Sequence, residues 1–310
     1  MKIIIIGAGG VGGYFGGKLA KAGNDVTFIA RGEHMNKMKT NGLLVKSILG
    51  DFLVYPVKVT DRISEAGVAD LVILAVKAWQ VIAIMPEIKS LINQNTIILP
   101  LQNGVSTFGE LRHFVSDKNI MGGFCRTYSK LESAGVIIHF GITPTIIFGE
   151  TDHSKTERLT ILKDLFDNSG ITSIISEDIQ SDLWKKFILI CLSGFLAVTS
   201  STYGELREIK ETRQMMIDIL AEVYKLSIQA GAIIDPDFIG QTISYIDTLP
   251  YETTASLSRD VLEGKPSEIE YQNGTVVRLA EKYGIETPLN RFIYRCILPM
   301  EIKARANQRG

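Results

Sequence analysis

The strongest constraint on the fold lies in the first twelve residues of the chain. Four consecutive isoleucines, residues 3–6, lead directly into GAGGVG, which carries the G-x-G-x-x-G pattern at Gly7, Gly9 and Gly12. A strand that runs through such a turn into a helix is the unit that binds a dinucleotide. A helical pattern and a second strand pattern follow, which is the context that the motif requires. A glycine-rich turn that binds no ligand is the alternative.

The motif predicts a separate task for each of its glycines. Gly7 is expected to make the tight turn, Gly9 to let the backbone approach a pyrophosphate, and Gly12 to let the helix pack on the strand. The N-terminus of the helix then faces the phosphates. The predicted cofactor-binding loop consists of Gly7, Ala8, Gly9, Gly10, Val11 and Gly12.

The whole chain divides into two parts with different patterns. Before about residue 177, continuous apolar runs such as LVILAV and TIILPL alternate with helical or loop segments, as in a parallel sheet buried on both faces. After it, long helical stretches are separated by turn residues. We therefore predict an α/β protein, with a Rossmann-type doubly wound sheet domain (residues 1–177) and an all-helical domain (residues 178–310). A cleft between the domains is the expected ligand site.

The boundaries of the individual elements follow from the same patterns. The predicted strands are residues 2–6, 25–30, 52–59, 70–76, 96–101, 120–122, 136–140, 145–149 and 172–176. The predicted helices of the second part are residues 182–198, 212–230, 237–249, 267–283 and 288–306.

Composition argues against several classes of protein. The net charge of −1 gives no electrostatic reason to bind nucleic acid or an anionic membrane. Three scattered cysteines and four histidines without ligand spacing predict no disulfide framework and no metal site, and we expect the histidines on the surface or in loops. No signal peptide and no bilayer-spanning run is visible, which predicts a soluble, cytoplasmic protein. A homodimer is compatible with the apolar helical part, although no pattern requires one.

The end of the second predicted strand bears on the choice of dinucleotide. NAD sites usually carry an acidic residue there, which binds the ribose 2′-hydroxyl. This chain has Arg31, whose guanidinium suits a 2′-phosphate by charge and by bidentate geometry. We therefore favour NADP(H) as the cofactor. Glu33, two residues later, is the competing candidate for the ribose, and an Arg31 that is merely solvated is the third possibility.

Two more polar positions lie where a ligand could be contacted. Lys77 and Asn103 each follow a predicted strand, and ligands of open α/β sheets bind beyond the carboxyl ends of strands. A solvated lysine and an ordinary Asn-Gly turn are the alternatives.

In LWKKF, Lys185 and Lys186 open an apolar run, although lysine is rarely buried unless it is paired or used. Periodicity does not choose between these two lysines.

An ordered set of motifs resembles that of the ketopantoate reductases (2-dehydropantoate 2-reductases). The motifs are GAGGVG, FIARGEH, VKAWQ, LQNGV, LWKKF and GKPSEIEYQNG, and they run in order across nearly the whole chain. The resemblance implies NADPH-dependent reduction of a 2-keto acid to a 2-hydroxy acid, ketopantoate to pantoate in the name-giving activity. It implies cofactor contacts at the glycine loop and at Arg31, Lys77, Asn103 and Glu268.

The resemblance also implies the reacting groups. The general-acid lysine, two residues after a tryptophan, falls on Lys186, and the catalytic glutamate falls on Glu268. Substrate contacts fall on Asn103, Lys186 and Ser256. Hydride delivery to a ketone leaves charge on the oxygen, and a lysine near that oxygen can stabilise and protonate it.

Glu268 also has a purely structural interpretation. In the predicted helix 267–283 it would be a first-turn carboxylate, which is favourable to the helix dipole. Ser267 and Glu270 have the spacing of a capping box, which points the same way.

Four positions depart from the family pattern, which has asparagines where this chain has Ile190, Gly194, Tyr203 and Thr253. Lys186, Ile190 and Gly194 are predicted to share one helical face, so that the last two are also substrate-contacting positions. Discrimination built on lost amide hydrogen bonds can reach about 10⁴-fold. The reaction type is kept, but a bulkier or more apolar 2-keto acid becomes a candidate substrate beside ketopantoate.

Two other functions are compatible with the sequence. One is a related two-domain hydroxyacid dehydrogenase with a different substrate, because the fold alone does not separate these enzymes. FIARGEH and SEIEYQNG argue against it. The other is a sensor that binds NADP(H) without turnover, for which Lys186 would be dispensable.

Overall fold

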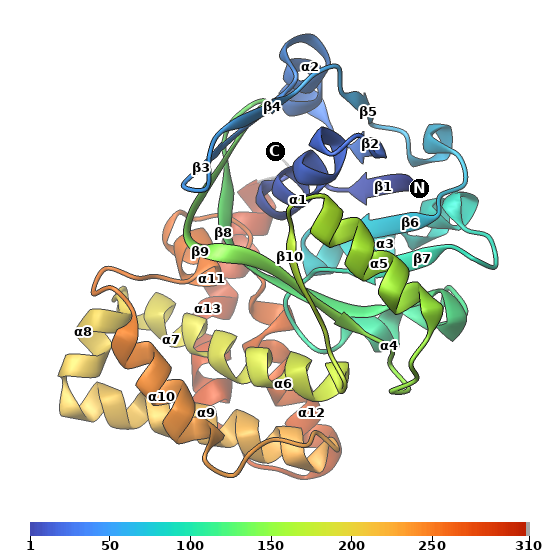
Figure 1. Cartoon of the computed structure of the whole chain (residues 1–310). Helices are drawn as coiled ribbons and strands as arrows, with labels where there is room; N and C mark the ends of the chain where they lie inside the picture. The colour runs from blue at the N-terminus through green and yellow to red at the C-terminus, as the bar shows by residue number, and fades with distance from the viewer. Residues whose placement is uncertain (308–310) are drawn as a thin grey trace. The chain divides into compact units, whose positions relative to one another are not determined.

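The computed structural model describes residues 1–307 of the chain, which form two compact units (Figure 1). The first, here called the sheet unit, comprises residues 1–102 and 107–179. The second, the helical unit, comprises residues 103–106 and the chain from residue 180 onwards. Within residues 1–307 every strand lies in the sheet unit, so the predicted order of an α/β part followed by an all-helical part is confirmed.

The sheet unit is built on a parallel sheet with the strand order β5-β2-β1-β6-β7. Its strands are β1 (Lys2–Ile6), β2 (Asp25–Ile29), β5 (Lys58–Thr60), β6 (Leu71–Leu74) and β7 (Ile97–Pro100). The central strand β1 pairs with both neighbours, for example Ile5 with Phe28 on β2 and with Ile73 on β6. A central strand is covered on both faces, which explains the unbroken isoleucine run.

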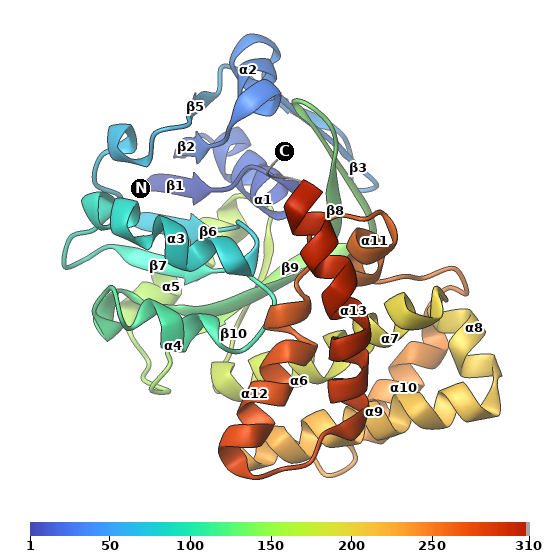
Figure 2. The same cartoon turned by 180° about the vertical axis from the view of Figure 1, so that it is seen from behind.

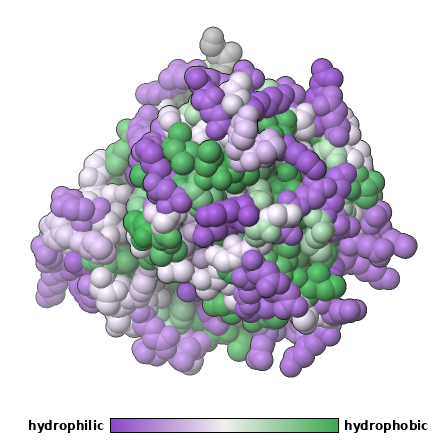
Figure 3. Space-filling model, turned by 45° about the horizontal axis from the view of Figure 1, so that its top comes forward, coloured by the Kyte–Doolittle hydropathy of each residue, from purple (hydrophilic) through white to green (hydrophobic). Residues whose placement is uncertain are grey.

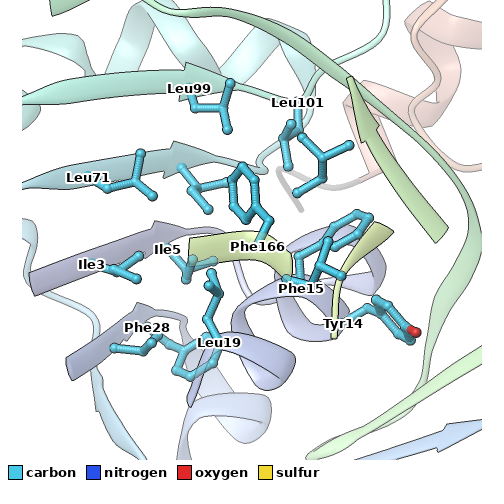
Figure 4. Close-up of a cluster of buried hydrophobic side chains, with 14 of the residues drawn as sticks. Ile3, Ile5, Tyr14, Phe15, Leu19, Phe28, Leu71, Leu99, Leu101 and Phe166 are labelled. Atoms are coloured by element: carbon cyan, nitrogen blue, oxygen red, sulfur yellow. The ribbon is translucent and has the colours of Figure 1, made fainter. Parts of the chain in front are cut away.

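Helices cover both faces of this sheet, as expected for a doubly wound fold. Consecutive side chains of a strand point to opposite faces. Ile5 shares a buried cluster with Phe15 of α1 and Phe166 of α5 (Figure 4), whereas Ile4 belongs to a second buried cluster with Met85 of α3. The helices and 3-10 turns of the sheet unit are α1 (Gly10–Lys21), α2 (Gly32–Asn41), η1 (Ile63–Ala66), α3 (Ala78–Ile88), η2 (Lys89–Leu91), α4 (Thr107–Leu111), η3 (Asp117–Asn119) and α5 (Glu157–Asn168).

The sheet unit contains a second, mixed sheet that the sequence did not predict. Its strands are β3 (Leu43–Ser47), β4 (Phe52–Val54), β8 (Gly122–Ser133), β9 (Val136–Gly149) and β10 (Thr172–Ile175), in the order β10-β9-β3-β4 with β8 antiparallel to β9. The predicted strand 52–59 is in fact β4 and β5, which belong to different sheets. Pro56 separates them, and proline has no N–H to continue a ladder. The predicted strands 136–140 and 145–149 are one strand, β9, and β3 was missed.

The helical unit packs its helices around one buried apolar cluster, which includes Phe187, Leu220, Val223 and Ile297. The elements are α6 (Ile179–Ile190), α7 (Leu192–Thr199), α8 (Tyr203–Glu208), α9 (Lys210–Gln229), α10 (Phe238–Thr248), α11 (Ser256–Leu262), η4 (Ile269–Tyr271), α12 (Asn273–Tyr283) and α13 (Pro288–Asn307). Figure 2 shows the long α13 in red.

Two predicted helices of this unit were wrong in their boundaries. The predicted helix 182–198 is divided at Cys191 into α6 and α7. The predicted helix 267–283 begins only at Asn273, because the residues before it form the 3-10 turn η4. The second difference changes the local structure around Glu268.

Across residues 1–307 no helix has both the length and the apolar character needed to cross a membrane. On the face shown in Figure 3, hydrophilic residues border separate hydrophobic patches.

Candidate active site

The glycine-rich loop between β1 and α1 has the geometry that its glycines were expected to need. Gly7 has a φ of 96°, and a Cβ there would lie 2.9 Å from Val76. A Cβ at Gly12 would lie 1.9 Å from the carbonyl oxygen of Gly7, so α1 approaches the loop only without a side chain. Gly9 has open space where its side chain would be. The loop therefore fits a dinucleotide pyrophosphate at the N-terminus of α1, where backbone N–H groups lack intrahelical partners.

The other members of the loop are tied to the surrounding structure. Ala8 is buried, and Val11 packs at the margin of the buried cluster under α1. Gly10 lies against the hairpin of β8 and β9, since a Cβ there would lie 2.4 Å from the carbonyl oxygen of Ser129. These contacts hold the loop from both of its sides.

Arg31 and Lys77 extend from the same edge of the parallel sheet. Arg31 follows β2 and is exposed, and Lys77 follows β6 and is half-buried, with Nζ 5.8 Å from the centre of the Trp79 ring. Because β1, β2 and β6 are parallel, the glycine loop and both cations lie beyond the carboxyl ends of neighbouring strands. Glu33 is exposed in the first turn of α2, so the fold does not choose between Arg31 and Glu33.

His34 makes two hydrogen bonds at this edge of the sheet that the sequence did not reveal. Its Nδ1 accepts a hydrogen bond from the backbone N–H of Gly135 at 2.9 Å, which requires the proton to sit on Nε2. Nε2 then donates to the carbonyl oxygen of Ala8 at 2.8 Å. His34 thus joins the glycine loop to the turn between β8 and β9. Its place in the FIARGEH motif, one helical turn after Arg31, was the only available signal.

The expected surface or loop location was wrong for one histidine, His139, which lies in β9. His34 is half-buried, and His139 is fully buried between Ser47 and the carbonyl group of Ile142, each 2.8 Å from one ring nitrogen.

In the helical unit, the predicted helix that carries Lys186 is divided at Cys191. Lys186 and Ile190 lie on α6, whereas Gly194 lies on α7. Side chains replace the helix bonds lost at the break. The hydroxyl of Ser193 donates to the carbonyl oxygen of Ile190 at 2.5 Å, and the Nδ2 group of Asn273 donates to that of Cys191 at 3.0 Å.

The two adjacent lysines of α6 differ in their surroundings. Lys185 forms an ion pair with Asp182, at 2.9 Å between Nζ and Oδ1. Its side chain is about one third exposed, as is that of Asp182 (36% and 32%). Lys186 is half-buried. The choice of Lys186 as the reacting lysine and its catalytic role stay predictions.

Gly194 faces the interior of the helical unit. A Cβ at this position would lie 2.5 Å from Oδ1 of Asn273 and 2.6 Å from Cγ2 of Ile293. Only its backbone is therefore available to a ligand, and an asparagine at this position would require its neighbours to move. The substrate contact expected at Gly194 stays a prediction.

Asn103 and Glu268 are brought together although 165 residues separate them in the sequence. Nδ2 of Asn103 donates to Oε2 of Glu268 at 3.0 Å, and both residues belong to the helical unit. Gly104, with a φ of 108°, lies beside the same turn, because a Cβ there would lie 2.9 Å from the carbonyl oxygen of Tyr271.

The structural interpretation of Glu268 as a first-turn residue of a long helix was wrong. Glu268 precedes the 3-10 turn η4, and α12 begins five residues later at Asn273. Ser267 forms no capping box with Glu270, since its hydroxyl donates to Glu301 instead. Glu268 is therefore held by specific side-chain contacts rather than by a helix dipole.

Two positions that depart from the family pattern contact each other. The backbone N–H of Tyr203, a buried residue at the start of α8, donates to the carbonyl oxygen of Thr253 at 3.0 Å. Ser256, the predicted substrate-contacting serine, begins α11 three residues later, and α11 packs against α7. The fold thus gathers Tyr203, Thr253 and Ser256 near the helix that carries Gly194.

Comparison with known proteins identifies the family. A model of the ketopantoate reductase PanE/ApbA family matches residues 3–153, and a model of the C-terminal domain of the same family matches residues 178–301. The chain belongs to the ketopantoate reductase family. The resemblance carried by the six motifs is confirmed, and the family is one of oxidoreductases that use a nicotinamide dinucleotide, NAD(P)H.

The proteins that this chain is similar to carry different names. The chain is 29% identical to the uncharacterized oxidoreductase YkpB of Bacillus subtilis, over 95% of this chain and 97% of that protein. It is similar to the structure of 2-dehydropantoate 2-reductase from Geobacter metallireducens, with a TM-score of 0.90, 27% identity, and 96% and 99% of the two chains covered. A ternary structure of D-mandelate dehydrogenase with NADH and anilino(oxo)acetate has the same TM-score of 0.90, with 26% identity and coverage of 98% and 99%.

Proposed function

We propose that this protein is an NADPH-dependent 2-keto acid reductase in which Lys186 is the general acid. The observation that carries the proposal is the hydrogen bond between Asn103 and Glu268. Two residues that the motifs assign to one site, from distant parts of the sequence, meet at 3.0 Å within the helical unit. A catalytic carboxylate needs this kind of fixed partner, because a carboxylate on an irregular turn is otherwise free to reorient.

The residues of the sheet unit would hold the cofactor. The glycine loop presents backbone N–H groups to the pyrophosphate, and Arg31 presents a guanidinium to the 2′-phosphate. Lys77 adds a second cation at the same edge. When bound, NADPH supplies the hydride.

The residues of the helical unit would carry out the remaining chemistry. As hydride reaches C2 of the keto acid, the Nζ group of Lys186 donates a proton to the ketone oxygen, which completes the 2-hydroxy acid. The neutral amine then recovers its proton from water. Glu268, held by Asn103, orients the ammonium group, and Ser256 contacts the substrate.

Ketopantoate is the first candidate substrate, because the family name and relatives such as the Geobacter enzyme point to it. A branched or aromatic 2-keto acid is the second. Ile190, Tyr203 and Thr253 stand where amides would bind a polyhydroxy acid. The D-mandelate dehydrogenase, a structural relative over nearly the whole chain, was solved with an aromatic oxoacetate.

A substrate panel tests the proposal directly. Oxidation of NADPH and of NADH would be followed at 340 nm with ketopantoate and with branched and aromatic 2-keto acids. We expect turnover with NADPH and at least one keto acid, and the preferred acid decides between the two candidates. The absence of turnover with every acid would refute the reductase and favour the sensor. Activity only with other alcohols in the oxidative direction would favour a different hydroxyacid dehydrogenase. The cytoplasmic location and the homodimer stay predictions.

A further inference from the structure

Helix α13 contacts the chain immediately before Glu268 through one buried carboxylate. Oε2 of Glu301 accepts two hydrogen bonds from Ser267, one from the backbone N–H at 2.8 Å and one from the hydroxyl at 2.7 Å. Oε1 of Glu301 lies 2.6 Å from Nη2 of Arg305. Ser267 and Glu301 are both buried (0% and 3% exposed), and a buried carboxylate is tolerated only with such partners. Residue 267 is therefore fixed to α13.

The same helix contacts the chain immediately after Glu268. The hydroxyl of Tyr294 donates to Oε1 of Glu270 at 2.6 Å, and Arg278 of α12 lies 2.9 Å from Oε2 of the same carboxylate. Burial, followed by the bond to Glu270, raises the pKa of Tyr294 to about 12. The hydroxyl therefore keeps its proton at neutral pH and remains a donor to Glu270.

The two contacts come from one face of α13. Tyr294 and Glu301 are seven residues apart, or about two helical turns, so their side chains point in nearly the same direction. Ser267 and Glu270 lie on either side of Glu268. We infer that Tyr294 and Glu301 are positioning residues, which fix the main chain on both sides of Glu268 and so hold its carboxylate against Asn103.

The local structure explains why Glu268 needs the contacts of Tyr294 and Glu301. Between the end of α11 at Leu262 and the start of α12 at Asn273, the chain has only the 3-10 turn η4 to order it. A reacting group displaced by about 1 Å can cost about 100-fold in rate. Two anchors on α13 supply the order that a longer helix would otherwise provide.

The substitution Glu301→Gln tests the first anchor, and this test rests on the proposed function, in which Glu268 is catalytic. The amide keeps the size of the carboxylate but presents one acceptor and one donor group, so it cannot satisfy both Ser267 and Arg305. We expect kcat to fall about 10- to 100-fold while KM for NADPH changes little. In the Glu268→Gln background the same substitution should cause no further loss of kcat, because the effect acts through Glu268. Equal losses in both backgrounds would overturn the inference.

A matched control separates positioning from general stability. Glu150 of the sheet unit is also a buried glutamate (5% exposed) that binds a hydroxyl, that of Thr156, and a guanidinium, that of Arg158. Glu150→Gln should lower the melting temperature about as much as Glu301→Gln and leave kcat unchanged. An equal loss of kcat in both variants would mean that Glu301 acts only through stability.

A crystal structure gives a readout that needs no turnover. In Glu301→Gln, and in the milder Tyr294→Phe, we expect the Asn103–Glu268 hydrogen bond to lengthen beyond hydrogen-bonding distance while the apolar core of the helical unit is unchanged. If both variants keep this bond at the 3.0 Å of the wild type, the inference is wrong. An inactive wild-type enzyme would instead refute the proposed function and leave this comparison valid.

Discussion

The glycine-rich loop and the turn that carries Glu268 are both irregular segments, but different parts of the chain hold them. The loop is shaped by its own residues and by adjacent strands: Gly12 packs on Gly7, and Gly7 packs on Val76. The turn is held by side chains from elsewhere in the sequence, namely Asn103 and Glu301. A motif that builds its own geometry is visible in a short stretch of sequence, whereas a segment held from a distance is not.

The two regions also differ in the task that we propose for them. The loop edge of the sheet unit would bind the cofactor, and the helical unit would carry out proton transfer. Substitutions of Lys186 and of the residues that hold Glu268 should therefore change kcat first, and substitutions at the loop edge should change cofactor affinity first.

Lys186→Ala should have the largest effect. Loss of a general acid typically costs about 10²- to 10⁴-fold, and we expect a decrease of that size in kcat, because no other group would protonate the ketone oxygen. The affinity for NADPH, measured by fluorescence titration, should be nearly unchanged. Steady-state kinetics with the preferred keto acid is the measurement.

Lys185→Ala is the control for this prediction. Lys185 makes a partly exposed ion pair with Asp182, and such pairs contribute about 0–1 kcal/mol to stability. We expect nearly wild-type kcat. If Lys185→Ala inactivates the enzyme and Lys186→Ala does not, the assignment of the acid is reversed.

Arg31→Ala tests the loop edge. Removal of charge-assisted hydrogen bonds to a 2′-phosphate should weaken NADPH binding by about 1.5–3 kcal/mol, or roughly 10- to 150-fold, and leave NADH binding unchanged. Glu33→Ala is the matched variant, because Glu33 lies two residues after Arg31 and is also exposed. Two outcomes would assign the ribose contact to Glu33 instead of Arg31. One is a wild-type enzyme that binds NADPH and NADH equally tightly, and the other is a loss of NADH affinity in Glu33→Ala.

The fold class and the cofactor edge could be predicted from the sequence because both depend on local patterns. The isoleucine run of residues 3–6 predicts a central strand, and the glycines that follow predict the turn. The second sheet could not be predicted, since β3 was missed and β4 joins β5 through a strand-like run whose only break is Pro56. Strand pairing depends on contacts between distant residues, which periodicity does not reveal.

The helical unit shows the same limit at the candidate site. The run 187–198 is apolar apart from Ser193 and Gly194, and no local signal in it marks the division at Cys191. The carbonyl oxygen of Cys191 accepts a hydrogen bond from the amide of Asn273, which is 82 residues away. Ser267 and Glu270 have the spacing of a capping box in the sequence. In the structure, the hydroxyl of Ser267 donates to Glu301 and the carboxylate of Glu270 accepts from Tyr294, so the capping box does not form. Contacts with residues distant in the sequence decide whether a capping box forms. The family resemblance pointed to Glu268 as a site residue, whereas the local spacing predicted the start of a helix.

Gly12→Ala should distort the glycine-rich loop and lower the stability of the protein. The added Cβ would lie 1.9 Å from the carbonyl oxygen of Gly7, so α1 must shift, and overpacking of this kind costs about 1–3 kcal/mol of unfolding free energy. Chemical denaturation measures this loss. Gly9→Ala is the informative partner, because nothing lies within 4 Å of its added Cβ. It should keep the stability of the wild type and weaken NADPH binding, and unchanged NADPH affinity in Gly9→Ala would contradict the predicted approach of the pyrophosphate.

Asp247→Asn should have the smallest effect, because this residue belongs to neither region. Arg213 holds Asp247 through two hydrogen bonds, at 2.6 and 2.7 Å, and the guanidinium lowers the pKa of that carboxyl from its ordinary value of 3.8. A lowered pKa in the folded state means that the pair stabilises the protein above the ordinary pKa and loses this contribution as the pH falls through the lowered value. Both side chains are partly exposed (34% and 41%), so we expect less than about 1 kcal/mol at pH 7, and less in high salt.

Denaturation of the wild type and Asp247→Asn from neutral to acidic pH measures this contribution. The difference between their unfolding free energies should be largest near neutral pH and disappear in acid below the lowered pKa of Asp247, while kcat and NADPH affinity at neutral pH stay at wild-type values. A difference that grows in acid would contradict the sign of the pKa shift. A loss of kcat would show that contacts outside the Glu268 turn also control the reaction, which would weaken the distinction between the two regions.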